Sequence, residues 1–303
     1  MSNDQRPTIL LTGGTGVLGR TLRATLPMYG YSIVTPEILL PDHKSIGGRF
    51  DLSRNHLQLA RLIPICPTAV IHAAAAIPHL STHNTQDTAD RTRKIDRNLF
   101  EAVSLWQCPI IYFSGCNLYE KQIDTPSDEL APIRTDLENN PYLEAKYDGD
   151  KLFQSYPMST IFRISSPIGT RLHTASVLAQ FIHAATKDET LSVWGSGTRE
   201  QDFIDTRDIA NAARLVFIMS KFGVFNVASG NPTNMSCLAR MVISVVGSGR
   251  LSISQIDDKK EEEKASYSIQ KIANELNWQP SHSLINSIRW VFQSYLKNEI
   301  LFS

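Results

Sequence analysis

The stretch Leu10–Arg20 reads LLTGGTGVLGR and places four glycines within seven residues, directly behind the apolar run Thr8–Leu11. Glycine inside a helix or strand is less favourable than alanine by roughly 0.5–1 kcal/mol, so this density indicates a backbone task that no side chain allows. The spacing G-x-G-x-x-G is met by Gly14, Gly16 and Gly19, between a predicted strand and a predicted helix. Such glycines permit a tight turn, a close approach to phosphates and helix–strand contact. We therefore predict that the loop holds a pyrophosphate at a helix N-terminus.

Composition places the chain among ordinary globular proteins. Of its 303 residues, 42% are hydrophobic and 20% charged, which suffices for a large buried core. Thirty basic residues balance thirty acidic ones and no basic stripe with interleaved aromatics occurs, so we expect no nucleic-acid partner. No apolar signal region and no run near the roughly 18 apolar residues of a membrane span occur, so we expect a cytoplasmic protein without membrane contact. The four cysteines lack metal-ligand spacing, and we expect no metal site.

Apolar runs and amphipathic stretches alternate along the first half of the chain, which is the rhythm of βαβ units. We predict strands at 8–12, 31–35, 69–74, 109–114 and 158–164, and helices at 17–29, 86–106 and 141–156. The predicted fold class is α/β, a Rossmann-type doubly wound parallel sheet. Further along, we predict helices at 177–186, 207–221, 268–277 and 284–297, and a strand at 223–228. We expect residues 1–165, with later segments near 203–230, to form the dinucleotide-binding domain, and residues 166–303 to form most of a smaller C-terminal substrate-binding lobe.

A carboxylate follows the second predicted strand. Glu37 lies about twenty residues after the glycine-rich loop, where a dinucleotide fold places an acidic acceptor for the ribose hydroxyls. This carboxylate would repel the extra phosphate of NADP and no arginine neighbours it, so NAD is favoured over NADP. The stretch Phe50-Asp51-Leu52 would place Asp51 near the adenine. A surface glutamate and an ordinary loop aspartate are the alternative interpretations.

Tyr142 and Lys146 are four residues apart in a predicted helix, so their side chains leave the same face. A neighbouring ammonium favours the phenolate and draws the pKa of a tyrosine down toward the working range of a general acid or base. Such a pair is also common on exposed helix faces. After a glycine-rich dinucleotide loop and a strand ending in Ser114-Gly115, it indicates a catalytic pair.

Ten short segments, in order, resemble the extended short-chain dehydrogenase/reductase family, and within it the NAD-dependent nucleotide-sugar epimerase/dehydratase group. They extend over nearly the whole chain and are residues 12–19, 50–52, 70–75, 98–102, 142–146, 163–169, 193–197, 201–210, 223–230 and 273–280. The resemblance implies an NAD cofactor, a nucleotide-sugar substrate and a homodimer formed through the helices 86–106 and 141–156. The dimer contact would be formed by Leu99, Val103 and Trp106. Alternatively, these side chains are apolar because they are buried in the monomer.

The resemblance assigns roles to residues of this chain. Tyr142 would take or give the proton of a sugar hydroxyl, and Lys146 would bind the nicotinamide ribose and tune Tyr142, while the cofactor exchanges hydride with the sugar carbon. His72 is interpreted as a structural histidine near the cofactor loop. The other residues expected around the cofactor are Gly13, Gly16, Val17, Leu18, Gly19, Glu37, Asp51, Leu52, Ala73, Ala74 and Ala75.

Departures from the family pattern bear on the chemistry. Gly115 stands where the family has a Ser or Thr whose hydroxyl polarises the reacting oxygen. Ser114 is one residue early and would point to the opposite face of its strand. Three alternatives follow. A bulge turns Ser114 toward the site, or Cys116 or Asn117 replaces the missing hydroxyl, or the third catalytic group is absent. Cys116 can equally be a buried residue that packs in the core. Cys116 and Asn117 also take the places of the Asp-Glu pair of sugar 4,6-dehydratases, which argues against elimination of water.

The residues expected around the substrate depart as well. Ser166 stands at the family's sugar-nucleotide asparagine and Gln201 at its arginine, with Arg199 two residues earlier. Arg199 would grip a diphosphate from a shifted position, or is an ordinary loop arginine. Trp194 would pack the small lobe or line the nucleotide site.

The sequence thus predicts an NAD-dependent nucleotide-sugar epimerase. The enzyme would oxidise a sugar carbon to a ketone, with C4 as the preferred position, and return the hydride to the other face of that carbon. A nucleotide-sugar ketone reductase is the alternative enzyme. A non-catalytic protein that binds NAD or a nucleotide sugar is the alternative outside enzymes, because Gly115 removes a hydroxyl that the chemistry uses. The intact Tyr142 and Lys146 argue against that last alternative.

Overall fold

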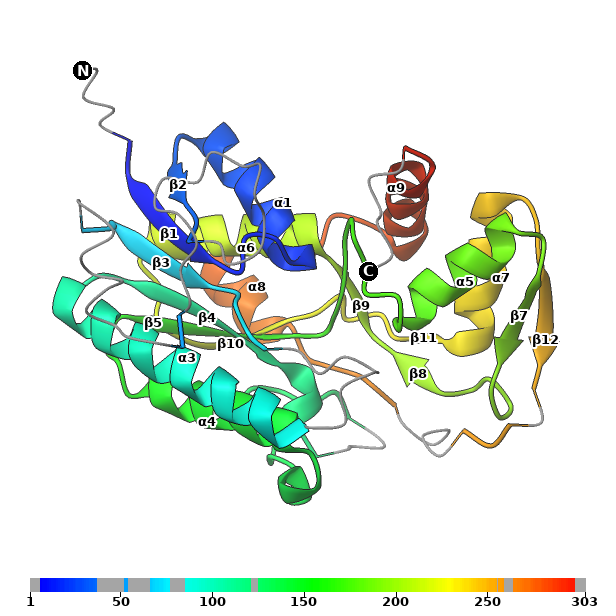
Figure 1. Ribbon diagram of the computed structural model, residues 1–303, viewed down its shortest axis with the longest axis horizontal. Coiled ribbons are helices and arrows are strands. Elements are labelled where there is room, and N and C mark those ends of the chain that lie inside the picture. The colour runs from blue at the N-terminus through cyan, green and yellow to red at the C-terminus, as the bar shows by residue number, and fades with distance from the viewer. Residues whose placement is uncertain are drawn as a thin grey trace. The chain divides into compact units, whose positions relative to one another are not determined.

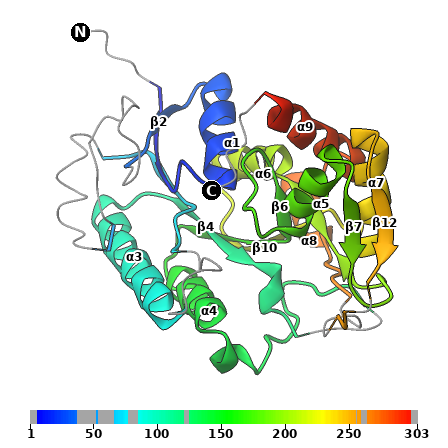
Figure 2. The same ribbon diagram turned by 45° about the vertical axis from the view of Figure 1, so that its right-hand side comes forward.

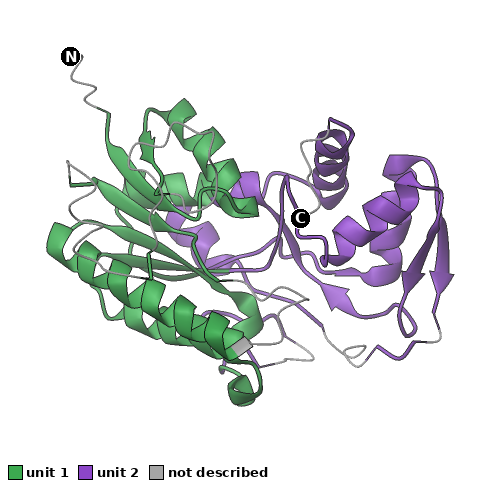
Figure 3. Ribbon diagram, viewed as in Figure 1, with its two compact units in different colours: residues 1–118, 133–163, 210–225 green, residues 119–132, 164–209, 226–303 purple. Residues whose placement is uncertain are grey.

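The computed structural model describes residues 6–36, 52–53, 66–76, 85–120, 125–254, 256–258 and 264–297. The chain divides into two compact units (Figure 3). The first comprises residues 1–118, 133–163 and 210–225, and the second comprises residues 119–132, 164–209 and 226–303. Among the described helices, none is long and apolar enough to cross a membrane.

A six-stranded sheet, built mostly from the first unit, has the strand order β10-β5-β4-β3-β1-β2. Its strands are β1 (Thr8–Thr12), β2 (Ser32–Val34), β3 (Ala69–His72), β4 (Ile110–Gly115), β5 (Ser159–Ile164) and β10 (Gly223–Val227). β1 pairs in parallel with both β2 and β3, and β3 pairs in parallel with β4. From β1 the chain first builds outward to β2 and then crosses over to β3, so the topological switch point lies between β1 and β3. The predicted α/β doubly wound sheet is confirmed.

Helices cover both faces of this sheet. Figure 1 shows α3 (Thr85–Trp106) and α4 (Pro141–Gln154) along one face and α1 (Val17–Thr25) and α6 (Thr206–Met219) along the other, and Figure 2 shows α3 and α4 side by side. The continuous apolar runs of β1, β3 and β4 follow from this double cover. The helix predicted at 17–29 is divided after Thr25, where a 3₁₀ turn begins, because Pro27 lacks the N–H that an α-helix requires.

The core of the first unit contains two residues that were candidates for a dimer seam. Leu99 is 0% and Val103 1% exposed, and both belong to a cluster with Tyr112 and Phe153 against which Trp106 packs. Burial in the monomer therefore explains Leu99 and Val103, and the interpretation of these residues as an exposed seam is wrong. The homodimer itself stays a prediction.

The second unit is built from short paired strands and helices. β6 (Ser166–Ile168) pairs with β9 (Phe203–Asp205), β7 (Thr190–Val193) with β12 (Arg250–Ile253), and β8 (Glu200–Gln201) with β11 (Thr233–Asn234). Its helices include α5 (Val177–Thr186), α7 (Met235–Val246), α8 (Gln270–Leu276) and α9 (Leu284–Leu296). Helix α7 was not predicted from the sequence, although Asn234 caps it by accepting from the Cys237 N–H and Gly247 ends it with φ +86°.

A buried ion pair joins α4 to β5. The Asp150 and Arg163 side chains are 0% and 6% exposed, and two guanidinium N–H groups of Arg163 each donate to a different Asp150 carboxylate oxygen at 3.0 Å. This bidentate geometry pairs both charges where the two side chains are buried. The backbone carbonyl of Arg163 also accepts the Cys116 thiol at 3.0 Å. The pair therefore fixes α4 against the strand beside β4.

We predict that Asp150→Ala lowers the free energy of unfolding by about 3–5 kcal/mol, because it removes the carboxylate that neutralises the buried Arg163 charge. The control is Lys151→Ala on the same helix, whose ammonium pairs with Asp148 at 3.4 Å across exposed side chains. Loss of that surface pair is expected to change stability by about 0–1 kcal/mol. Urea denaturation followed by circular dichroism measures both variants, and equal midpoints would contradict the prediction.

Candidate active site

The glycine-rich loop lies at the switch point of the sheet, between β1 and α1. Gly13 has φ +72°, and a Cβ built on it would lie 2.6 Å from the carbonyl carbon and oxygen of Ala73. A Cβ on Gly19 would lie 2.0 Å from the Gly13 carbonyl oxygen. Gly13 therefore serves both the turn and the close approach to the loop after β3, and Gly19 lets α1 pack against the glycine loop.

The donor set of this loop suits an anion. Gly16 is the N-cap of α1, which begins with Val17 and Leu18; no side chain caps the helix and its first turn has no acidic residue. The first backbone N–H groups of α1 and the positive end of its dipole therefore adjoin the glycine-rich loop, which approaches the backbone of Ala73 and Ala74 at Gly13. Ligands of doubly wound sheets bind in the crevice at this switch point. These residues fit the pyrophosphate of a dinucleotide.

Three further residues were predicted to bind the cofactor, and only Leu52 is among the described residues. Leu52 is buried in the core cluster with Leu10 and Val70, and its carbonyl accepts from the Asn98 side chain at 2.8 Å. Glu37 and Asp51 lie outside the described residues.

Tyr142 and Lys146 lie on α4 as predicted, and both are partly buried. The Lys146 ammonium does not hold Tyr142 but donates to the Tyr112 hydroxyl at 2.7 Å, with Nζ 4.1 Å from the centroid of that ring. Burial raises the pKa of Tyr142, and the Asp96 carboxylate raises it further. The expected lowering of the Tyr142 pKa is therefore wrong for this arrangement, and the phenol keeps its proton at neutral pH. Burial also lowers the pKa of Lys146.

Behind Lys146 lies a buried polar network. Tyr112 donates to Asp96 Oδ2 at 2.9 Å, and His72 Nε2 lies 2.9 Å from Asp96 Oδ1. His72 Nδ1 lies 2.7 Å from the Thr12 hydroxyl, which accepts the Ala74 N–H at 3.3 Å. Burial lowers the pKa of His72 and raises that of Tyr112, so both are neutral. The structural interpretation of His72 fits these contacts.

The segment after β4 decides among the candidates for a third polar group. Ser114 stays in β4 and its buried hydroxyl has no hydrogen-bond partner among the described residues. Cys116 is 1% exposed and donates its thiol to a backbone carbonyl, so it packs in the core. Asn117 is exposed, and a Cβ on Gly115 would lie 2.3 Å from Asn117 Oδ1. The Asn117 carboxamide thus occupies the volume of the side chain that Gly115 lacks.

In the second unit, the two residues that depart from the family pattern at expected substrate positions, Ser166 and Gln201, contact each other. Gln201 of β8 donates its side-chain amide to the Ser166 hydroxyl of β6. Arg199 is held by an ion pair, with Nε 2.9 Å from Asp258 Oδ2. Trp194 is 54% exposed at a turn, so it does not pack the interior of its unit.

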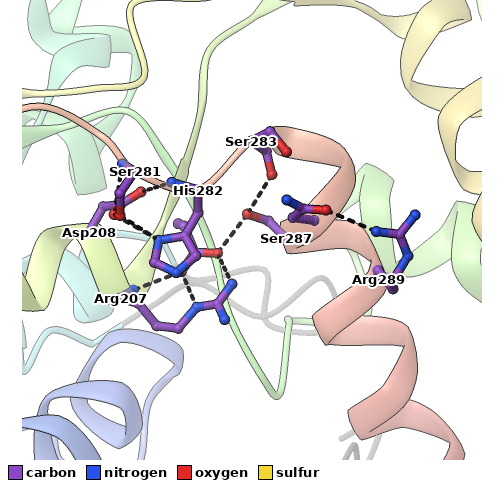
Figure 4. Close-up of polar contacts among 9 residues, drawn as sticks. Arg207, Asp208, Ser281, His282, Ser283, Ser287 and Arg289 are labelled. Carbon is purple, nitrogen blue, oxygen red and sulfur yellow. Dashed lines mark hydrogen bonds and ion pairs between the residues drawn. The ribbon is translucent and has the colours of Figure 1, made fainter.

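A second polar cluster, to which the sequence patterns assign no function, lies at the starts of α6 and α9 (Figure 4). Asp208 Oδ1 lies 2.6 Å from the Ser281 hydroxyl and 2.8 Å from His282 Nδ1. The Ser281 hydroxyl also lies 3.1 Å from that same Nδ1. A catalytic triad uses both imidazole nitrogens, one toward each partner, so this cluster is not one. The Asp208 carboxylate also accepts the backbone N–H groups of Ser281 and His282, each at 3.1 Å, and thereby stabilises the turn that precedes α9.

A doubly wound sheet with a glycine-rich loop at its switch point and a Tyr-x-x-x-Lys helix in the same unit defines a dinucleotide-dependent protein of the extended short-chain dehydrogenase/reductase type. Residues 9–228 match the model of the NAD dependent epimerase/dehydratase family, and the chain belongs to this family.

Known proteins similar to this chain include enzymes of nucleotide-sugar metabolism. The putative GDP-L-fucose synthase 2 of Arabidopsis thaliana is 26% identical over 96% of this chain and 92% of its own length. The UDP-glucose 4-epimerase structure from Thermotoga maritima, determined with UDP-glucose, has a TM-score of 0.81 at 20% identity, covering 96% of this chain and 99% of that one. The UDP-N-acetylglucosamine 4-epimerase structure from Bacillus cereus has a TM-score of 0.82 at 17% identity, covering 94% and 98%. At these identities the two structures show the shared fold.

We predict that Gly13→Ala weakens NAD binding at least about tenfold, because the added methyl would overlap the backbone of Ala73 and displace the loop. Gly30→Ala is the matched control, since Gly30 has φ +87° but a Cβ added there would meet nothing within 4 Å. Both variants carry the left-handed strain of roughly 1–2 kcal/mol, and only one carries the overlap. Isothermal titration with NAD measures the difference, after circular dichroism has shown that both variants are folded. Equal affinities would argue against the close approach.

Proposed function

We propose that the chain is an NAD-dependent nucleotide-sugar epimerase that acts at a sugar carbon, C4 in the first place. The observation that carries this proposal is an unbroken hydrogen-bonded chain. It runs from Thr12, at the start of the glycine-rich loop, through His72, Asp96 and Tyr112 to Lys146, four residues from Tyr142. Residues suited to a dinucleotide and a proton-transfer pair are thereby tied to one rigid framework.

The first unit would act as the cofactor domain and the second would hold the nucleotide sugar through residues that include Ser166, Trp194 and Arg199. When bound, NAD supplies acceptance and return of a hydride. Tyr142 would take the proton of the reacting hydroxyl on its phenol oxygen and return it after the sugar has presented its other face. Lys146 would bind the nicotinamide ribose. The preference for NAD over NADP rests on Glu37.

Asn117 would supply the polar contact that Gly115 lacks. Its carboxamide occupies the volume next to Gly115 and carries an N–H₂ donor, which can polarise a sugar oxygen as a hydroxyl does. Cys116 and Ser114, the other candidates, are both buried.

A nucleotide-sugar ketone reductase is the second candidate, and the protonation of Tyr142 favours it. A reductase needs a proton donor beside a hydride donor, and a phenol with a raised pKa is such a donor at neutral pH. The name of the relative from Arabidopsis thaliana, a putative GDP-L-fucose synthase, fits a protein acting on a GDP-sugar. Reduced NADH or NADPH would then be the cofactor.

The function is tested by incubating the protein with UDP-, GDP-, dTDP- and CDP-sugars and 4-keto sugars, with NAD, NADH or NADPH, and separating products by chromatography with mass detection. We predict a product of unchanged mass with NAD, and at least about a hundredfold loss of rate in Tyr142→Phe, because that variant cannot transfer the proton. Tyr147→Phe on the same helix is the control, since Lys151 stacks on its ring and Lys146 does not. A gain of two hydrogens with NADH or NADPH would identify the reductase instead, and loss of water would contradict both.

The pH dependence separates the two functions further. An epimerase that begins with proton abstraction uses the Tyr142 phenolate, so its kcat/KM rises with pH throughout the neutral range, toward the raised pKa. A reductase uses the phenol and keeps a constant rate over that range, then declines as the pH approaches the same pKa.

We predict that Asn117→Ala lowers kcat by about tenfold to a hundredfold, at or below the loss seen for one oxyanion-type donor. In Gly115→Ser/Asn117→Ala the serine hydroxyl enters the vacated volume and restores part of the rate. The kcat values of the variants are compared on the substrate that the nucleotide-sugar assay identifies. A full rate in Asn117→Ala would exclude the carboxamide from the reaction.

A further inference from the structure

One row of side chains crosses three strands of the sheet. Thr12 of β1 stands opposite His72 of β3, and His72 stands opposite Tyr112 of β4, each as direct partners in the parallel register. Direct partners leave the sheet on the same face. Asp96 of α3 contacts both His72 and Tyr112, so the helix contributes the carboxylate that completes the row.

The direction of each hydrogen bond follows from the donors available. Neutral His72 donates from Nε2 to Asp96 and accepts the Thr12 hydroxyl on Nδ1. Tyr112 gives its only proton to Asp96, so its oxygen is left to accept from Lys146. Both carboxylate oxygens of Asp96 therefore accept a hydrogen bond. The Tyr112 hydroxyl lies between this carboxylate and the Lys146 ammonium and links the two by hydrogen bonds.

The packing around Tyr112 leaves its hydroxyl little freedom. The ring is 0% exposed and stacks on Phe153 with centroids 4.6 Å apart and planes 25° apart. On the α4 face shared with Lys146, a Cβ at Gly149 would lie 2.1 Å from the Tyr112 hydroxyl and 2.2 Å from Asp96 Oδ2. Glycine is unfavourable inside a helix, but at position 149 it leaves the space that the Tyr112 hydroxyl and the Asp96 carboxylate occupy.

We propose that Tyr112, backed by Asp96, is a positioning residue that fixes the Lys146 ammonium for the cofactor. The hydroxyl holds Nζ in place before NAD arrives, so less side-chain freedom is lost on binding. The same row ends at the Ala74 N–H, so one buried carboxylate orders the loop after β3 and the lysine of α4. This inference rests on the proposed function insofar as Lys146 contacts NAD.

Tyr112→Phe tests the inference because it removes one oxygen and keeps the stacked ring. The matched control is Tyr156→Phe, whose hydroxyl donates to the backbone carbonyl of Cys108 at 3.1 Å and whose ring packs against the same core. We expect Tyr112→Phe to weaken NAD binding about tenfold, as for a lost hydrogen bond to a charged group. We also expect a lower kcat with the KM for the nucleotide sugar unchanged within about twofold, and no such change in Tyr156→Phe. Equal NAD affinities of the two variants overturn the inference.

A double-mutant cycle with Lys146→Met decides whether Tyr112 acts through the lysine. If it does, Tyr112→Phe produces less than about a twofold further change in NAD affinity once Lys146 is replaced. A full, additive tenfold loss overturns the inference, because Tyr112 then acts on NAD binding by a route other than Lys146. Affinities are measured by titration up to millimolar NAD, so that weak binding is still quantified. Because no sugar is present, a failed sugar assay refutes the proposed function while the cycle still decides the inference.

Discussion

The buried carboxylate of Asp96 is the group on which the site depends. It is 1% exposed in the interior of the first unit, where an unpaired charge would be strongly unfavourable. Its two oxygens are satisfied by one donor from β3 and one from β4, so α3 and two strands are held in one arrangement. Removing either donor would leave a buried charge short of a partner, which explains why the polar row is continuous.

Close backbone approach is the second constraint, and glycines meet it where the site needs space. Gly13 and Gly19 bring β1, α1 and the loop after β3 within contact, and Gly149 brings α4 onto the Asp96–Tyr112 pair. In all three places the volume of a methyl group is already occupied by backbone or by a rigid polar group. The first two glycines shape the loop that is predicted to hold a pyrophosphate, and the third lets Lys146 reach the network.

The parts of the site that the sequence predicted are those with local signals. The glycine spacing lies within seven residues, and Tyr142 and Lys146 are separated by a single helical turn, so neither needed knowledge of the sheet. The partnership of Lys146 with Tyr112 joins residues 34 positions apart and depends on strand order and register. Asn117 could be placed beside Gly115 only after the 3₁₀ turn Cys116–Leu118 was known. In the second unit, α7 was missed although its buried residues Met235, Leu238, Ala239 and Val242 recur at helical spacing, because the short apolar stretch ends in β-branched residues that fit a strand as well.

The chemistry of Tyr142 depends on where the Lys146 charge resides. With the ammonium held at the Tyr112 hydroxyl, burial and the Asp96 charge act on Tyr142 and raise its pKa, so the phenol keeps its proton at neutral pH. Base catalysis would need the ammonium to lie closer to the Tyr142 oxygen, because a nearby positive charge lowers the pKa of a buried phenol. The Lys146 ammonium has three N–H donors, so it can keep its bond to the Tyr112 hydroxyl and still donate to a cofactor ribose. A ribose bound there would change the surroundings of the charge that lies near Tyr142, and the acid or base character of Tyr142 would then be coupled to cofactor binding.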